Sequence, residues 1–392
     1  MTHKNDSTAL AEAMEQVIEH GMDGLSDAMT ILLNEAMKIE RSRALQAVPW
    51  ERTDQRLGYA NGYKDKALDT RVGRLQLSIP QVRGDVSFYP SALERGLRSE
   101  RALLLAMAEM YVKGVSTRKV QDVLQKLCGL EITATQVSRA CEKLDQEIEQ
   151  WRNRPLGCIP FLQLDATYEK VRCDGTVVSC AVLIATGVNL AGKRSILGVS
   201  VSLSEAEVHW REFLGRLKER GIHGIEMITS DDHQGLRAAL RATFNGVPWT
   251  RCHVHLQRNA AAYVPRLQMR AEVAQDIRSI LNAPDLDEAQ RLLAKTVMKY
   301  ESKASRLAQW MQSNLPDGFT IFKLPPYQRR RLRSTNMLER LNKEIKRRTR
   351  VATLFPNEQS LLRLVSAILM EISDEWEAGR IYLRMSNSEL AN

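Results

Sequence analysis

A single carboxylate inside an apolar run is the feature that most constrains how this chain folds. Residues 161–168 have the sequence Phe-Leu-Gln-Leu-Asp-Ala-Thr-Tyr, so Asp165 lies within a segment that otherwise favours burial in a sheet. A buried carboxylate is costly unless another group pairs with it or binds it. A divalent cation held by further carboxylates would offset that cost. The fold is therefore expected to bring other acidic residues to Asp165.

The order of the elements after residue 160 predicts the sheet that would do this. Strands are expected at 161–172, 177–188 and 194–202 as an antiparallel meander, and then at 225–229 and 249–255. Asp174-Gly175 predicts the first turn. Ser204, with Glu207 at the capping-box position, predicts a helix over 204–220, and another helix is expected up to residue 244. This order is that of a ribonuclease H-like core within a mixed α/β fold.

Such a core supplies the acidic partners. Its first and fourth strands are neighbours, so an aspartate at the end of the fourth strand would face Asp165. That residue is Asp231 or, failing that, Asp232. Glu339 follows on a later helix, capped by Ser334 or Thr335, whose apolar face would pack beside the first strand.

Three carboxylates on this scaffold predict a metal-dependent reaction at phosphorus. Asp165, Asp231 and Glu339 would hold two Mg²⁺ ions roughly 4 Å apart, with Mn²⁺ as a substitute. One ion would activate a water or a 3′-hydroxyl, and the other would stabilise the leaving oxygen of an in-line displacement. A nucleophilic serine in a GxSxG turn is absent from the sequence.

The charge balance points to nucleic acid as the substrate. The net charge is +9 and the isoelectric point is about 9.3, which favours an anionic partner. Basic residues are concentrated at 329–350, around Glu339. A charge run of this kind is often only a solvated face, but here it surrounds a single acid on a helix. The side chains expected to contact the phosphate backbone are Arg330, Arg333, Asn336, Arg340, Lys343 and Arg347.

A second DNA-binding element is predicted before the sheet. Helices are expected at 103–112, 117–127 and 134–148, with Gly114 as a stop, Ser116 as an N-cap and Gly129 as a second stop. Polar and basic residues early in the third helix (Gln136, Ser138, Arg139) favour a helix-turn-helix. A plain three-helix bundle uses the same spacing and is the alternative.

The pattern divides the chain into five segments. We expect an N-terminal helical and small β region at 1–100, the helix-turn-helix-like DNA-binding region at 101–155, the first part of the core at 156–255, an all-helical insertion at 256–328, and the C-terminal helices of the core at 329–392. Within the first segment, residues 8–45 have helical periodicity and residues 71–80 alternate like a strand, whereas 52–66 is polar. The last helix is expected at 359–383.

The cysteines and the N-terminus bear on the compartment. The six cysteines form no CxxC pair, so they are expected to be reduced thiols of a cytosolic protein. Neither a signal peptide nor a membrane span is apparent. Cys252 and His255 form a CxxH pair that would be half of a zinc site. Without a second pair, they are better explained as a strand thiol and a histidine near the acidic cleft, where His255 contacts DNA or orients a carboxylate. His233, beside Asp231, has the same ambiguity.

Taken together, these motifs resemble one family closely. Asp165, the stretch Thr229-Ser-Asp-Asp-His-Gln-Gly-Leu236, the Cys252-x-x-His255 pair and the stretch Ser334-Thr-Asn-Met-Leu-Glu-Arg-Leu-Asn342 are similar to those of Mutator-type bacterial insertion-sequence transposases. The likeness covers nearly the whole chain, including the segment 58–63.

The resemblance implies a DDE-type DNA transposase with Asp165, Asp231 and Glu339 as its catalytic, metal-binding triad. Cys252 and His255 would be the additional Cys-His motif, and a helical insertion would separate Asp231 from Glu339. The implied substrates are double-stranded terminal inverted repeats and target DNA, joined by strand transfer through circular intermediates. The implied location is the bacterial cytoplasm, at the nucleoid, and pairing two DNA ends calls for a homodimer or a higher oligomer on DNA.

Two other functions fit parts of the same sequence. A non-enzymatic DNA-binding protein, such as a repressor, would need only the helix-turn-helix and would tolerate Glu339→Gln. A metal-dependent nuclease would use the acids but would not join strands. Joined products would separate the nuclease from the transposase.

Overall fold

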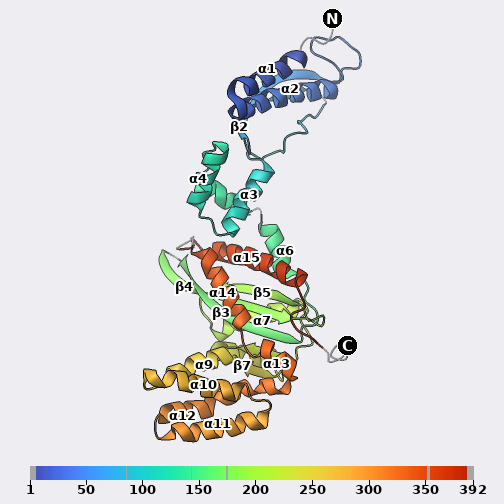
Figure 1. Ribbon diagram of the computed structural model, residues 1–392. Helices are drawn as coiled ribbons and strands as arrows, with labels where there is room; N and C mark the ends of the chain where they lie inside the picture. Colours follow the sequence, from blue (N-terminus) through green and yellow to red (C-terminus); the bar gives the residue numbers. More distant parts are fainter. Residues whose placement is uncertain (1–5, 85, 143, 174, 351–353, 386–392) are drawn as a thin grey trace, which may run out of the picture. The chain divides into compact units, whose positions relative to one another are not determined.

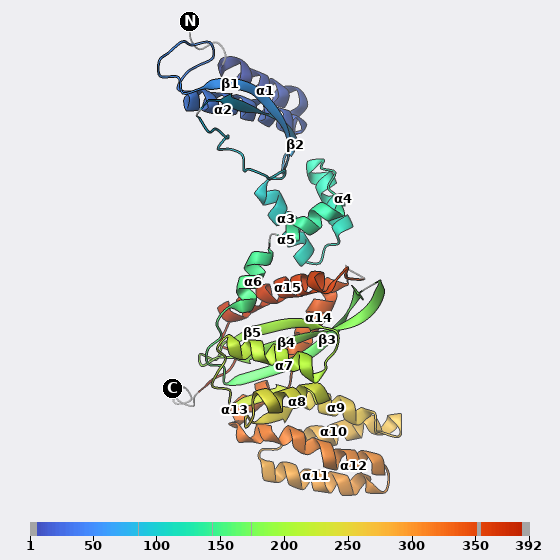
Figure 2. The same ribbon diagram turned by 180° about the vertical axis from the view of Figure 1, so that it is seen from behind.

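The computed structural model divides the chain into two compact units, Met1–Leu144 and Asp145–Asn392 (Figures 1 and 2). It describes residues 6–84, 86–142, 144–173, 175–350 and 354–385. The division falls before residue 155, where the sequence predicted the boundary of the DNA-binding region. In the described part of the chain, no helix is long and apolar enough to cross a membrane.

The first unit begins with helices against a two-stranded ribbon. Helices α1 (Asp6–His20), η1 (Gly21–Gly24) and α2 (Leu25–Leu45) precede strands β1 (Tyr59–Thr70) and β2 (Gly73–Arg83), which pair antiparallel. Met37 of α2 packs with Leu75, Leu77 and Ile79 of β2. The sequence predicted only the second strand. It missed β1 because this strand is exposed along most of its length and carries no apolar alternation.

Three further helices complete this unit around a core of Met107, Val120, Leu124 and Val137. They are α3 (Arg101–Val112), α4 (Thr117–Cys128) and α5 (Ala134–Glu142). The Ser116 hydroxyl accepts a hydrogen bond from the Lys119 amide at 3.2 Å, so the predicted N-cap is confirmed.

The third of these helices is shorter than the sequence predicted. It ends at Glu142, and α6 (Asp145–Asn153) is a separate helix of the second unit. The reason is packing: α5 buries Val137 and Ala140 in the first unit, whereas Ile148 and Trp151 of α6 are buried in the second, where α6 lies against α15 (Glu358–Ala378). Two apolar stripes that face different cores cannot belong to one straight helix.

The second unit is built on a mixed five-stranded sheet with the order β5-β4-β3-β6-β7. The strands are β3 (Phe161–Cys173), β4 (Thr176–Val188), β5 (Arg194–Ser202), β6 (Met227–Ser230) and β7 (Trp249–Arg251). The antiparallel meander of the first three is confirmed, and so is the prediction that the fourth strand, β6, neighbours the first, β3; the two run parallel. Asp174, in the predicted first turn, lies outside the described residues; Gly175 has φ +81°, which favours glycine.

Helices cover both faces of this sheet (Figures 1 and 2). On one face, α7 (Glu207–Glu219) packs through Trp210 and Leu214, and α8 (Gln234–Thr243) through Leu236 and Ala239, in a core that includes strand residues such as Leu162 and Leu183. On the other lie α14 (Asn336–Thr349) and α15. The predicted capping box of α7 does not form. The helix starts at Glu207 with Ala206 as its N-cap, because the Ser204 hydroxyl is used by the Ala206 amide in the preceding turn at 3.3 Å.

The last strand is also shorter than predicted. β7 pairs only with β6, which ends at Ser230, so no partner strand is available beyond Arg251. The chain turns instead into α9 (His253–Ala261), with Cys252 as its N-cap residue. Cys252 and His255 are therefore at the start of a helix, and their prediction as strand residues is wrong.

The expected helices follow β7. They are α9, η2 (Leu267–Met269), α10 (Arg270–Leu281), α11 (Leu286–Glu301), α12 (Ser305–Asn314) and η3 (Leu315–Lys323). They form a hydrophobic core of their own that includes Ile277, Leu293, Leu307 and Met311. A short helix, α13 (Pro326–Leu332), returns the chain to α14. The final helix, α15, ends at Ala378 rather than at the predicted residue 383.

Candidate active site

Asp165 lies in the central strand β3 and is only 8% exposed. One of its carboxylate oxygens, Oδ2, accepts a hydrogen bond from the Asn342 side-chain amide of α14 at 2.9 Å. Burial raises the pKa of Asp165 to about 7, and the nearby carboxylates of Asp231 and Glu205 add to the rise, whereas His255 opposes it. A carboxyl group held at this pKa ionises more easily once a cation is bound beside it.

Asp231 follows directly after β6, the parallel neighbour of β3. Its Oδ1 accepts the Asp232 amide at 2.7 Å. The next carboxylate is engaged differently: Asp232 forms ion pairs with Arg237 at 2.9 Å and with Arg251 at 3.0 Å. The structure thus separates two adjacent acids that the sequence left as alternatives. Two guanidinium groups pair with Asp232, whereas Asp231 acts electrostatically on Asp165.

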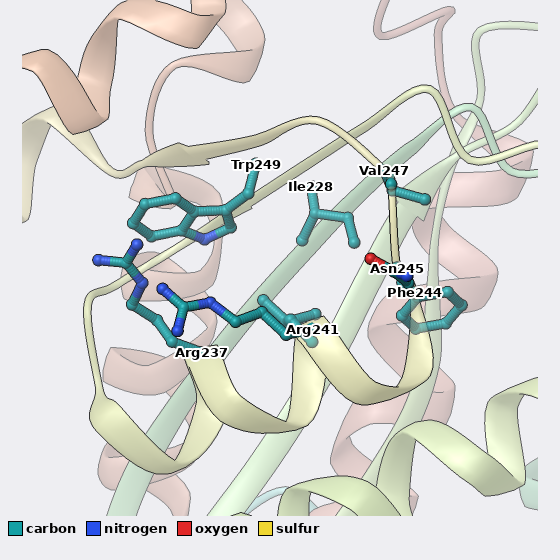
Figure 3. Close-up of a pocket in the computed structure, with 9 residues that line it drawn as sticks. Ile228, Arg237, Arg241, Phe244, Asn245, Val247 and Trp249 are labelled. Atoms are coloured by element: carbon teal, nitrogen blue, oxygen red, sulfur yellow. The ribbon is translucent and has the colours of Figure 1, made fainter.

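Arg237 is itself held in place by an aromatic ring. Its guanidinium lies 4.3 Å from the centre of the Trp249 ring, and it also reaches Asp317 at 3.4 Å. Figure 3 shows Arg237 beside this ring. Both residues line a cavity of about 110 Å³, together with other residues of α8, Ile228 of β6 and the segment 244–247. This network fixes the Asp232 carboxylate and ties the start of α8 to η3.

Glu339 lies in the first turn of α14. The apolar face predicted for this helix is buried, with Leu338, Leu341 and Ile345 between 0 and 2% exposed. Thr335 is the N-cap residue, as one of the two predicted, but its hydroxyl does not cap the helix. The Glu339 carboxylate pairs with Arg258 of α9, whose Nη1 and Nη2 lie 2.7 and 3.1 Å from its oxygens.

His255 lies between these acids. Its Nε2 is 4.0 Å from a Glu339 oxygen, and both Asp165 and Asp231 act on it electrostatically. The neighbouring Cys252 thiol is the main cause that raises the pKa of His255 to about 9. Burial by itself would raise the pKa of the Cys252 thiol, but the influence of His255 and the hydrogen bonds from Thr335 outweigh this, and the pKa is lowered. The amide and the hydroxyl of Thr335 each lie 3.3 Å from the sulfur.

The donors near His255 suit a hard divalent cation. Asp165, Asp231 and Glu339 offer carboxylate oxygens, the ligands that Mg²⁺ and Mn²⁺ prefer. The Asn342 side-chain oxygen, beside Asp165, is buried without a hydrogen-bond partner. The three acids surround His255 more openly than a closed metal site would. Among the described histidines, cysteines, aspartates and glutamates, only Cys173, Cys180 and Glu358 bring three ligand atoms within 4.8 Å of one another.

The predicted phosphate-contacting residues fall into three groups. Arg340 and Lys343 are exposed on α14, and neither pairs with a carboxylate within the described ranges; the same holds for Arg330 of α13. Arg347 is paired with Glu344 at 2.6 Å, and Arg333 is half-buried and donates to Asn282. The side chain of Asn336 lies outside the described part of the chain.

The predicted contacts of the helix-turn-helix lie in the first unit. Ser138 and Arg139 are exposed on α5. Gln136 forms a capping box with Thr133. The side-chain oxygen Oε1 of Gln136 accepts the Thr133 backbone amide at 2.7 Å, and the backbone amide of Gln136 donates to the Thr133 hydroxyl at 3.2 Å. Because the side-chain oxygen is used at the start of the helix, only the side-chain NH₂ group of Gln136 is available for a base or a phosphate.

Two residues that contact the three acids were missed by sequence reasoning. Arg258 and Asn342 follow His255 and Glu339 by three positions, so each shares a helix face with a residue that was singled out. That spacing could have identified Asn342, which lies on a predicted helix. It could not have identified Arg258, because the segment before it was assigned to a strand.

The family comparison agrees with these observations. The model of "Transposase, Mutator family" matches residues 1–379, and the chain belongs to this family of transposases. A transposase acts on DNA, so DNA is its partner.

Curated relatives support this assignment over the full length. The chain is 51% identical over 388 residues to the transposase for insertion sequence element IS406 of Burkholderia multivorans, covering 98% of this chain and all of that protein. It is 41% identical to the transposase for element ISRM5 of Rhizobium meliloti, covering 99% of this chain and 97% of the relative. A solved structure of a simian T-cell lymphotropic virus intasome complex matches 47% of this chain and 63% of its own, with 15% identity and a TM-score of only 0.17.

Proposed function

We propose that the chain is a DDE-type transposase with a ribonuclease H-like core, which cleaves the ends of its insertion sequence and joins them to other DNA. The observation that carries the proposal is that Asp165, Asp231 and Glu339 all act on one side chain, His255. They come from a central strand, the end of its parallel neighbour and the covering helix. The stability of the fold does not explain why these acids lie near one another, because burial already makes the charged form of Asp165 unfavourable.

Divalent cations account for the cost. Mg²⁺, or Mn²⁺ in its place, bound by these three carboxylates would activate the attacking oxygen and stabilise the leaving oxygen of phosphoryl transfer. Asn342 orients Asp165 through its 2.9 Å hydrogen bond. Arg258 of α9 pairs with the Glu339 carboxylate and would be displaced from it by the incoming cation. His255 carries positive charge between the acids, which eases their mutual repulsion.

The other residues of the region would serve DNA. Arg330, Arg340 and Lys343 are charged and lack carboxylate partners among the described residues, so they suit the phosphate backbone. The helix-turn-helix residues Ser138 and Arg139 would recognise the terminal inverted repeats. Because two ends must be processed together, we expect a dimer or a higher oligomer on DNA.

The test uses a plasmid that carries the two DNA ends bordering the gene for this chain. We expect the wild type with Mg²⁺ to give cleaved ends and joined-end circles. Glu339→Gln should bind the ends equally well and reduce both products by more than about 100-fold, because the lost charge is worth several kcal/mol in the transition state. The exposed Glu301→Gln, at the end of α11, is the matched control and should retain both products.

Each alternative predicts a different outcome. Cleaved ends without joined products would favour a nuclease. Equal products from Glu339→Gln and the wild type would remove Glu339 from the reaction. Binding of the ends without products from either protein would favour a repressor.

A further inference from the structure

A cavity of about 550 Å³ lies beside α14. It is lined by residues of α13, α14, the last turns of α15, the start of β5 and the segment after α15. The charged and aromatic residues that matter below are Arg194, Arg330, Arg331, Arg340, Trp376 and Tyr382.

The cavity carries an excess of positive charge. None of its four arginines pairs with a carboxylate anywhere in the ranges that the structure describes. One acid, Glu344, does line the cavity, but its oxygens are occupied by Arg347 at 2.6 Å and Arg348 at 2.7 Å. Burial, together with the charges of Arg331 and Arg340, lowers the pKa of Arg194. Guanidinium groups gathered without counter-charges favour the binding of an anion from outside the chain, phosphate above all.

Aromatic rings hold part of this charge in place. The Arg194 guanidinium lies 4.2 Å from the centre of the Trp376 ring and 5.1 Å from that of Tyr382. The Arg331 guanidinium also lies 5.1 Å from the centre of the Tyr382 ring. The Tyr382 hydroxyl donates to the Arg331 backbone carbonyl at 3.2 Å. Planar guanidinium and indole groups arranged in this way offer flat surfaces on which a nucleobase can stack.

Apart from Ser334, the remaining lining is apolar, and this narrows the choice of ligand. Met337 and Leu341 of α14 and Ile372 of α15 contribute to it. A phosphate ion would use only the arginines and leave this surface in contact with water. A nucleotide would use both parts, since it combines an anionic phosphate with a flat, largely apolar base.

We propose that this cavity binds an unstacked nucleotide of a DNA strand, with its phosphate on Arg330, Arg331 and Arg340 and its base stacked at Arg194 and Trp376. The inference deepens the proposed function and rests on it. α14 connects the two sites, since Arg340 follows Glu339 directly and neighbouring side chains on a helix point about 100° apart. A strand that leaves the duplex here would be anchored beside the acids.

The test measures binding without cleavage. The full chain in EDTA is titrated into two fluorescent 12-nucleotide single strands of the same length and charge, one with all its bases and one fully abasic. We expect the wild type to bind the base-containing strand at least about tenfold more tightly, the value of stacking one base. Trp376→Leu should remove this preference without weakening the binding of the abasic strand, and Trp376→Phe should retain most of it.

Arginine variants test the phosphate part. Arg340→Met should weaken the binding of both strands and lower the dependence of affinity on salt. The exposed Arg306→Met on α12 should change neither. Free dAMP, as a competitor, distinguishes a strand-bound nucleotide from a soluble one: we expect it to compete only weakly, because it lacks the neighbouring phosphates.

Three results would overturn the proposal. They are equal affinity of the wild type for the two strands, an unchanged preference in Trp376→Leu, and strong competition by dAMP, which would make the cavity a site for free nucleotides. All of these readouts are obtained without metal, so a failure here would leave the end-cleavage test of the proposed function unaffected.

Discussion

Two sides of helix α14 handle charge in opposite ways. On one side Glu339 joins Asp165 and Asp231, and the chain supplies its own cations, Arg258 and His255, to these acids. On the other side Arg340 joins three more arginines, and among the described residues no acid pairs with them. The acid side is therefore partly compensated within the chain, whereas the basic side is not.

The difference teaches what each side can bind. Arg258 is exposed over 59% of its side chain, so its pair with Glu339 is weak and an incoming cation can replace it. The arginines of the basic side have nothing to exchange and can only gain a partner. The acid side is thus suited to a metal that arrives by exchange, and the basic side to a strand of DNA.

The largest effect should come from the two adjacent aspartates of the acid side. We expect Asp231→Asn to reduce end cleavage by more than about 100-fold. Asp232→Asn should stay within about tenfold of the wild type, since this residue acts only through Arg237 and Arg251. The plasmid assay with Mg²⁺ measures both. Equal losses would show that the ion pairs of Asp232 do not distinguish the two acids.

A smaller effect should appear in the stability of the helix that supplies the cations. His253 of α9 is buried, its Nε2 lies 2.9 Å from the Gly318 carbonyl, and burial lowers its pKa to about 4. The folded-state pKa is below the ordinary 6.5, so the unfolded chain takes up the proton first. The fold therefore loses stability as the pH falls from about 6.5 to about 4, by at most about 3 kcal/mol.

This loss should be missing from a matched variant. The thermal midpoint of the wild type should fall more between pH 7 and pH 4.5 than that of His253→Gln, in which a side-chain amide can still donate to the carbonyl. The exposed His20→Gln should follow the wild type. If His253→Gln also followed the wild type, the buried histidine would not control the acid sensitivity of α9.

The smallest effect distinguishes the two sides directly. Arg258→Met should tighten the binding of Mn²⁺ roughly fivefold, because an exposed ion pair is worth up to about 1 kcal/mol and no longer competes for Glu339. Arg340→Met, on the basic side, should leave Mn²⁺ binding as it is. Calorimetry on the chain without DNA provides the measurement. Weaker Mn²⁺ binding by Arg258→Met would mean that the arginine positions Glu339 rather than competing for it.

Much of the sheet could be predicted because its signals are local. The meander of β3, β4 and β5 follows from apolar runs separated by turn residues, and the parallel pairing of β3 with β6 follows from the order of the elements. The buried face of α14, formed by Leu338, Leu341 and Ile345, could likewise be predicted from their spacing in the sequence. The errors occurred where a neighbour decides: β7 stops because β6 has ended, and Ser204 is used by a turn instead of a capping box.

The sequence by itself singled out the residues that we propose carry the chemistry. A carboxylate in an apolar strand, an aspartate after a later strand and a glutamate within a basic helix are visible in the order of the residues, since burial and periodicity depend on near neighbours. Only the tertiary structure decided how these charges are balanced. Arg251 and Arg237 pair with Asp232, Arg258 reaches Glu339 across 81 positions of the chain, and the arginine-lined cavity combines residues of β5, α13, α14, α15 and the segment after α15. Such pairings depend on distances in space, which the spacing along a sequence does not contain.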